Sequence, residues 1–123
     1  MKPSAKGFRR LIYASRYSWL GFKAAWKSEA AIRQELVALA VLLPIAVWLP
    51  VSPVEKALLI ASGFLVLLVE LINSALEAVV DRIGPEHHEL SGKAKDIGSA
   101  AVAVALIIAA SVWGIILFDY FKA

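Results

Sequence analysis

Apolar residues concentrate in three long stretches of the chain, and these stretches set the predicted architecture. They cover residues 30–51, 57–80 and 97–118. A membrane-spanning helix needs roughly 20 predominantly apolar residues, and the first stretch reaches that length only if a few polar residues form its beginning. The pattern therefore predicts three transmembrane helices, which are joined by a tight turn at 50–53 and by a polar connection at 81–96.

The N-terminal segment 1–29 follows a different pattern, in which large apolar and basic residues recur at helical spacing. At 100° per residue the two kinds of side chain fall on neighbouring arcs of one helix. This arrangement predicts an amphipathic helix lying on an anionic membrane surface, and a solvated basic arm is the alternative. The first arc holds Phe8, Ile12, Ser15, Trp19, Phe22 and Trp26, and the second holds Arg9, Arg16, Lys23 and Lys27.

Composition agrees with a membrane protein. Of the 123 residues, 60% are hydrophobic, which is more apolar surface than a soluble core of this size can bury. We therefore expect an all-α integral membrane protein with a single domain over residues 1–123. Cysteine is absent, so disulfides and thiolate metal sites are excluded. The net charge is +3, and the basic residues are expected to face a membrane. Nucleic acid is therefore not expected as a partner.

The distribution of basic residues predicts the orientation of the chain. Eight of the 13 Lys and Arg residues precede position 36, and only Lys56 lies near the first turn. Cytoplasmic segments of membrane proteins are enriched in Lys and Arg. We therefore expect a multi-pass protein of the bacterial inner membrane, with the N-terminus and the connection 81–96 in the cytoplasm and the C-terminus outside.

A stripe of polar side chains interrupts the second apolar stretch. Glu70, Asn73, Glu77 and Asp81 share one helix face, and Glu70 lies about 10 Å deeper than Glu77 at 1.5 Å per residue. Ionisable groups at membrane depth are costly and tend to mark transport pathways or chemistry. The stripe indicates a general base above a site for a hard cation such as Mg²⁺, and hydrogen bonding between helices is the alternative.

Other polar residues flank this stripe. Glu29 is either a carboxylate at the end of a surface helix or a second metal ligand that faces Glu77. The segment 91–96 begins the third spanning helix, where backbone N–H groups and Lys95 form a candidate phosphate site. The alternative for 91–96 is a charged helix end at the membrane surface. His87 and His88 lack the ligand spacing of a zinc site and are interpreted as loop residues.

Two runs of sequence carry a family resemblance. Residues 70–84 read Glu-Leu-Ile-Asn-Ser-Ala-Leu-Glu-Ala-Val-Val-Asp-Arg-Ile-Gly, and residues 88–101 contain Ser-Gly-Lys-Ala-Lys-Asp-Ile-Gly-Ser. Both runs closely resemble the prokaryotic diacylglycerol kinase family, and segments within 7–35 agree more loosely. Arg16 departs from the small residues that this family usually has before the Tyr of its surface helix.

The resemblance implies a homotrimeric membrane enzyme with one surface helix and three transmembrane helices in each subunit. It would transfer the γ-phosphoryl group of ATP, with Mg²⁺, to diacylglycerol and produce phosphatidic acid. Glu70 would be the general base, with Asn73 beside it, and Glu29 and Glu77 would bind the metal. The implied nucleotide contacts are Arg10, Tyr17, Glu29, Glu77, Glu86, His87, His88, Lys95 and Asp96. The implied lipid contacts are Arg10, Trp48, Lys56, Glu70, Ser99 and Trp113.

Three other functions compete with this interpretation. The related undecaprenol kinases share the fold and much of the motif, so the lipid acceptor is less certain than the reaction. A small proton-coupled transporter would use Glu70 as its proton carrier, although a transporter needs polar groups reaching both membrane faces. A noncatalytic assembly subunit would not need Lys95 and Asp96 beside Glu77.

Overall fold

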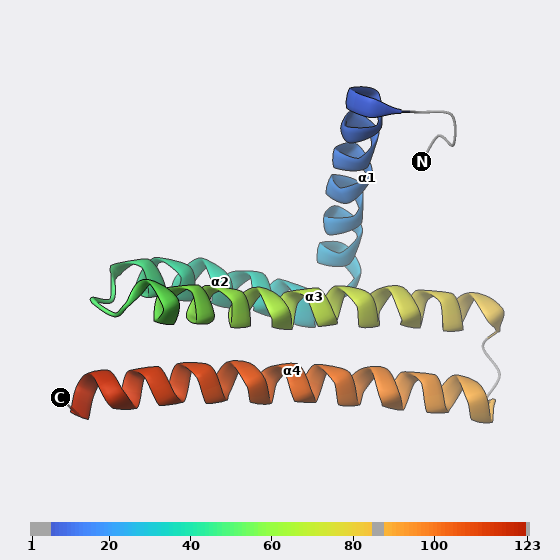
Figure 1. The fold of residues 1–123 in the computed structure, drawn as a ribbon. Coiled ribbons are helices and arrows are strands. Elements are labelled where there is room, and N and C mark those ends of the chain that lie inside the picture. Colours follow the sequence, from blue (N-terminus) through green and yellow to red (C-terminus); the bar gives the residue numbers. More distant parts are fainter. Residues whose placement is uncertain (1–5, 85–87, 123) are drawn as a thin grey trace. The chain divides into compact units, whose positions relative to one another are not determined.

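The computed structural model describes residues 6–84 and 88–122, and within these ranges all regular structure is helical. The elements are α1 (Gly7–Ser28), α2 (Ala30–Trp48), α3 (Pro53–Ile83) and α4 (Glu89–Lys122) (Figure 1). The last three are each long and apolar enough to cross a membrane. The predicted all-α class is therefore confirmed, and α2, α3 and α4 are three candidate membrane spans at the predicted places.

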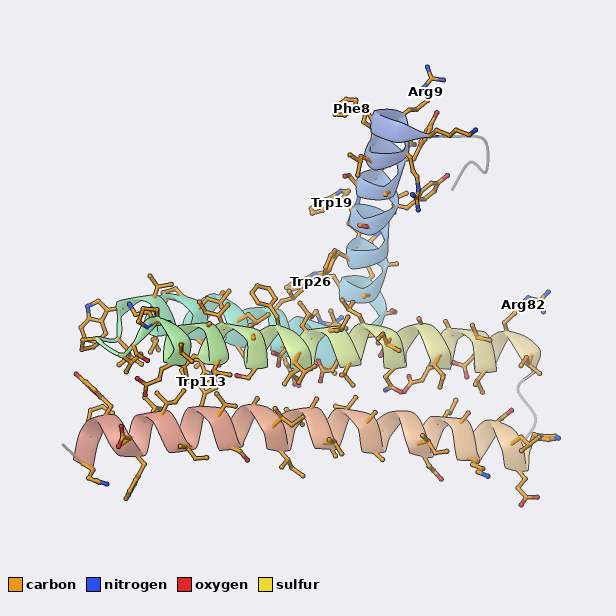
Figure 2. All side chains as sticks on the ribbon, viewed as in Figure 1. Phe8, Arg9, Trp19, Trp26, Arg82 and Trp113 are labelled. Atoms are coloured by element: carbon orange, nitrogen blue, oxygen red, sulfur yellow. The ribbon has the colours of Figure 1, made fainter. Side chains whose placement is uncertain are left out.

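Helix α1 belongs to the compact unit of residues 1–30, which is distinct from the unit of residues 31–123. It begins at Gly7, whose φ of 60° lies in the left-handed region that favours glycine. It ends at Ser28, and the extended Glu29 closes it by donating its N–H to Ala25 O at 2.9 Å. Phe8, Trp19 and Trp26 project from the same side of α1 (Figure 2), as their spacing predicts. The placement of α1 on a membrane surface stays a prediction.

The turn between α2 and α3 ends in a capping box that starts α3. The Ser52 hydroxyl accepts a hydrogen bond from Glu55 N at 3.2 Å, and the Glu55 carboxylate accepts one from Ser52 N at 3.0 Å. These bonds satisfy backbone donors that a helix start otherwise leaves unpaired. Pro53 occupies the first helical position, where its missing N–H costs nothing. Helix α3 therefore begins before the apolar stretch 57–80.

Helices α3 and α4 form an antiparallel hairpin whose arms lie side by side (Figure 1). With 31 and 34 residues they measure about 46 and 51 Å at 1.5 Å per residue. The hydrocarbon layer of a bilayer is only about 30 Å thick. The helices consequently continue beyond the apolar stretches 57–80 and 97–118. The predicted polar connection 81–96 was too long, because residues 81–83 and 89–96 are helical and only 84–88 lie between α3 and α4.

The hydrophobic core of the three-helix unit lies near the α2–α3 turn. Ala46, Leu49, Leu59 and Ile116 form one buried cluster with contributions from α2, α3 and α4. The indole N–H of Trp113, which lies between α3 and α4 (Figure 2), donates to Leu59 O at 3.2 Å. The Lys56 ammonium also donates to Val47 O at 2.6 Å. These bonds join the helices at the end of the hairpin remote from the connection at 84–88.

Candidate functional site

The polar stripe lies on α3, which remains helical throughout because the residues between the polar positions are good helix formers such as Leu and Ala. Glu70, Asn73 and Glu77 are partly buried, and Asp81 is exposed. Their spacing of three or four residues places all four side chains on one helix face. The structure therefore presents the stripe that the sequence predicts, with burial decreasing toward the end of α3.

Inside the stripe, Asn73 and Glu77 form a hydrogen-bonded pair. The Asn73 Nδ2 group donates to Glu77 Oε1 at 3.2 Å. Two other polar atoms, Glu70 Oε2 and Asn73 Oδ1, are buried and lack a hydrogen-bond partner in the part of the chain that the structure describes. A buried polar atom without a partner costs about 1–3 kcal/mol. Such a cost in the middle of an apolar helix favours a functional role for these groups.

Glu35 of α2 lies near the stripe, and no role for it was predicted from the sequence. The charge of Glu70 acts on the Glu35 carboxylate, and both side chains are partly buried. The Glu35 and Glu70 carboxylates are therefore close enough to interact electrostatically. An acidic residue within a spanning helix was itself a signal of function. Its electrostatic interaction with Glu70 depends on how α2 packs against α3, which the sequence pattern does not reveal.

The first part of α4 lies along the stripe. The Lys95 Nζ atom lies 2.8 Å from Asp81 Oδ1, and the charge of Glu77 also acts on Lys95. One turn further on, Gly98 lies directly against the Asn73 side chain. The structure thus places Lys95 beside the carboxylates of α3, and it identifies Gly98 as a contact that the analysis of the sequence did not assign.

The remaining predicted residues of this region are less closely engaged. Asp96 and Ser99 are exposed on α4, within two turns of Lys95. His88 precedes α4, and its Nδ1 atom accepts a hydrogen bond from Leu90 N at 3.1 Å. This bond caps the start of the helix. The predicted nucleotide contacts Glu86 and His87 lie outside the described residues.

Other predicted contacts come from elsewhere in the chain. Arg10, Tyr17 and Glu29 belong to the N-terminal unit, and Arg10 and Tyr17 are exposed there. The sharing of a metal by Glu29 and Glu77 stays a prediction. The predicted lipid contacts Trp48, Lys56 and Trp113 lie at the end of the hairpin where α2 meets α3. At 1.5 Å per residue, Lys56 is about 21 Å from Glu70 along α3, a separation that the acyl chains of a lipid can span.

The carboxylates of the stripe are chemically suited to Mg²⁺. This ion prefers oxygen ligands, and it usually takes one or two carboxylates together with phosphate oxygens and water. No group of three acidic or His side chains gathers as a metal site within residues 6–84 and 88–122. Glu77 nevertheless fits one ligand position, because Asn73 occupies only one of its two oxygens. A nucleotide phosphate would then provide part of the coordination.

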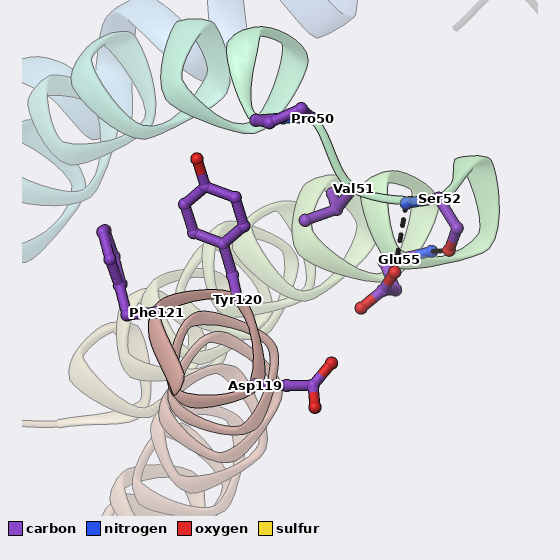
Figure 3. Close-up of a pocket in the computed structure, with 7 residues that line it drawn as sticks. All are labelled: Pro50, Val51, Ser52, Glu55, Asp119, Tyr120 and Phe121. Atoms are coloured by element: carbon purple, nitrogen blue, oxygen red, sulfur yellow. Dashed lines mark hydrogen bonds between the residues drawn. The ribbon is translucent and has the colours of Figure 1, made fainter. Parts of the chain in front are cut away.

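A cleft also opens at the opposite end of the hairpin (Figure 3). It has a volume of about 580 Å³, and its acidic side chains are Glu55 and Asp119. Glu55 already caps α3, and the rings of Tyr120 and Phe121 pack edge to face at a centroid distance of 4.9 Å. None of the seven residues that line this cleft is basic, whereas Lys95 accompanies the carboxylates of the stripe. The polar stripe is therefore the better candidate for phosphate chemistry.

The fold and the stripe together define a helical membrane protein with a group of carboxylates at one end of its helix hairpin. Residues 16–117 match the family model described as prokaryotic diacylglycerol kinase. A diacylglycerol kinase of Escherichia coli strain K12 is 54% identical over 121 residues, which cover 98% of this chain and 99% of that relative. A diacylglycerol kinase of Haemophilus influenzae is 50% identical over 112 residues, covering 91% of this chain and 95% of that relative. A diacylglycerol kinase of Pseudomonas aeruginosa is 50% identical over 111 residues, covering 90% of each chain.

This chain belongs to the prokaryotic diacylglycerol kinase family. The resemblance that the runs 70–84 and 88–101 suggested is therefore confirmed, and the chain is an enzyme of a kinase family. Both runs lie within the matched residues and contain the polar stripe together with the first part of α4.

Proposed function

We propose that this chain transfers the γ-phosphoryl group of ATP to the hydroxyl group of diacylglycerol and releases phosphatidic acid and ADP. The family membership supports the reaction class, and the named activity of the relatives supports the lipid acceptor. The observation that carries the mechanism is the buried, unpartnered Oε2 atom of Glu70 in an otherwise apolar part of α3. A base at membrane depth suits an acceptor that remains dissolved in lipid.

Glu70 is the proposed general base. It lies about 10 Å below Glu77 on the same helix face, which leaves room for the lipid hydroxyl and the γ-phosphate between the base and the proposed metal ligand. Its unpartnered oxygen has no hydrogen bond to lose when it accepts a proton. A positioned general base typically accelerates proton transfer by about 10²- to 10⁴-fold.

The nucleotide is proposed to bind at the opposite end of the stripe. Glu77 and Glu29 would hold Mg²⁺, which would neutralise phosphate charge when bound. Lys95, placed beside Asp81 and Glu77, would add a cation, and Asp96 would contribute a polar contact. The other proposed nucleotide contacts are Arg10, Tyr17, Glu86, His87 and His88.

The proposed reaction is a single in-line displacement. The lipid hydroxyl gives its proton to Glu70 while its oxygen forms a bond to the γ-phosphorus. The bond between that phosphorus and the oxygen bridging to the β-phosphate breaks, and ADP leaves with the bonding pair. Asn73 holds Glu77 through its 3.2 Å hydrogen bond, and Lys95 stabilises the charge on the transferred group. Glu70 then releases its proton to water, which restores the base.

The lipid is proposed to lie along the hairpin, with its hydroxyl at Glu70 and its acyl chains directed toward the α2–α3 turn. Ser99 and Arg10 would contact the polar part, and Trp48, Lys56 and Trp113 would lie along the chains. The cytoplasmic side is proposed for the nucleotide, in the bacterial inner membrane, with the N-terminus inside and the C-terminus outside. This orientation follows from the excess of basic residues before α2.

A homotrimer is the proposed assembly. Within the described residues, Glu70 Oε2 and Asn73 Oδ1 have no hydrogen-bond partner. Lipid cannot supply one. Small residues on α4, such as Ala103 and Ala110, permit close approach of a neighbouring helix. A second copy of the chain can therefore complete the surroundings of the stripe.

The decisive test measures ATP consumption by the purified protein in detergent micelles. We expect Mg²⁺-dependent ADP release with diacylglycerol as acceptor, and radiolabelled γ-phosphate in phosphatidic acid. Undecaprenol is the matched alternative acceptor. Faster turnover with undecaprenol would move the protein to the undecaprenol kinases. Proton flux in vesicles, without ATP consumption with either acceptor, would instead identify a transporter.

A further inference from the structure

We infer that Gly98 is a positioning residue for Glu77, the proposed metal ligand of the stripe. Because Gly98 lacks a side chain, the Asn73 carboxamide can hold Glu77 in place. The inference rests on the proposed role of Glu77. It concerns a contact between α4 and α3 rather than a group that touches the substrate.

The contact between Gly98 and Asn73 leaves no room for a side chain on α4. A Cβ atom added to Gly98 would overlap Asn73 Oδ1, and it would lie 3.2 Å from Asn73 Cγ and 3.7 Å from Leu76 Cδ2. The neighbour is a short carboxamide held between two helices, which has little freedom to withdraw. Any larger residue at position 98 must therefore rotate the Asn73 side chain.

The surroundings of Asn73 favour one orientation of its carboxamide. The glycine hydrogen that replaces Cβ points toward Oδ1, a direction that suits a weak C–H···O contact. This contact faces the one atom of Asn73 that lacks a conventional donor. The Nδ2 group is then left to donate to Glu77 Oε1 at 3.2 Å. The reversed carboxamide would bring two acceptors, Oδ1 and the Glu77 carboxylate, against each other.

Gly98 thereby controls Glu77 through Asn73. The hydrogen bond from Asn73 fixes one carboxylate oxygen of Glu77 and leaves the other for a cation. Groups that orient a metal ligand in this way typically change metal affinity or activity by about 10- to 100-fold when they are removed. Two other glycines lack this arrangement. Gly63 meets only the end of the Leu39 side chain, at 2.9 Å, and Gly114 has no atom within 4 Å of an added Cβ.

Those two glycines provide matched controls for Gly98→Ala. Gly63→Ala crowds a helix contact without touching the stripe, and Gly114→Ala adds the same methyl group to α4 in open space. Mn²⁺ binding to each purified protein is measured by electron paramagnetic resonance with a nonhydrolysable ATP analogue, and Mg²⁺ dependence of turnover is measured in parallel. We expect Gly98→Ala to weaken Mn²⁺ binding about 10- to 100-fold, whereas both controls bind as the wild type does. Wild-type Mn²⁺ affinity in Gly98→Ala would overturn the inference.

A double variant tests whether Gly98 acts through Asn73. Asn73→Ala removes the overlapping group, so the double variant with Gly98→Ala is expected to fold even where Gly98→Ala alone does not. We expect the double variant and Asn73→Ala to have the same Mn²⁺ affinity, because coupled residues are not additive. A further loss in the double variant would contradict the inference.

The variant Glu77→Gln distinguishes a failure of the proposed role of Glu77 from a failure of the inference about Gly98. Unchanged Mn²⁺ binding in Glu77→Gln would reject the proposed role of Glu77 and the inference with it. Weaker Mn²⁺ binding in Glu77→Gln together with wild-type affinity in Gly98→Ala would reject the inference alone.

Discussion

The two ends of the α3–α4 hairpin differ in whether their buried polar groups have hydrogen-bond partners. Near the α2–α3 turn, apolar side chains such as Leu59 and Ile116 are buried together, and the Trp113 N–H has an acceptor. Near the connection at 84–88, the buried Glu70 Oε2 and Asn73 Oδ1 atoms lack partners within the described residues. One end is built for stability, and the other retains unsatisfied polar groups at a cost in stability. This contrast predicts which variants alter turnover and which alter folding.

The largest expected effect comes from Glu70→Gln. Glutamine keeps the size and hydrogen-bonding capacity of the side chain but cannot take a proton. We expect kcat to fall at least about 100-fold, with little change in the KM for ATP. Steady-state kinetics in micelles provide the measurement. Glu55→Gln makes the same chemical change at the other end of α3, preserves the capping box and should leave kcat unchanged. Near-normal turnover in Glu70→Gln would assign Glu70 to helix packing.

A smaller effect is expected from Glu77→Gln, and it should concern the metal. The variant can still accept the hydrogen bond from Asn73, but it loses a charged ligand for Mg²⁺. We expect half-maximal turnover to need a Mg²⁺ concentration at least about tenfold higher than in the wild type. A Mg²⁺ titration at saturating lipid measures this concentration. Unfolding of the variant should match that of the wild type. An unchanged response to Mg²⁺ would show that Glu77 is structural.

The sequence predicted the helices well because apolar runs report directly on membrane spans. Their ends were less accurate, since polar residues continue α3 and α4 beyond the apolar stretches. The start of α3 at Pro53 follows from Ser52 and Glu55, whose spacing is that of a capping box. That signal was present in the sequence but lies outside the apolar run.

The site was most predictable within a single helix. The spacing of Glu70, Asn73 and Glu77 placed them on one face of α3, as the structure has them. Contacts between helices depend on how the helices are aligned along each other, which side-chain packing decides. The electrostatic interaction of Glu35 with Glu70 and the contact of Gly98 with Asn73 therefore emerged only from the structure.

Ser52→Ala tests the stable end of the hairpin. The variant removes the acceptor for Glu55 N, and loss of such a cap costs about 1 kcal/mol. We expect the unfolding midpoint in a denaturing detergent titration to fall, while the kcat of the folded protein stays the same. Ser52→Thr retains the hydroxyl acceptor and serves as the control. A lower kcat in Ser52→Ala would mean that the two ends of the hairpin are not independent.

The smallest effect is expected from Asp81→Asn, at the outer limit of the stripe. The Lys95 and Asp81 side chains are 46% and 67% exposed, so water and salt weaken their attraction. We expect no resolved change in the unfolding midpoint. The KM for ATP should fall modestly, because the variant removes a negative charge that competes with the phosphates for Lys95. This difference from the wild type should diminish as salt is added, which steady-state kinetics at several ionic strengths would measure. A rise in the KM for ATP would show instead that Asp81 holds Lys95 in its binding position. The nucleotide site would then include the exposed end of α3.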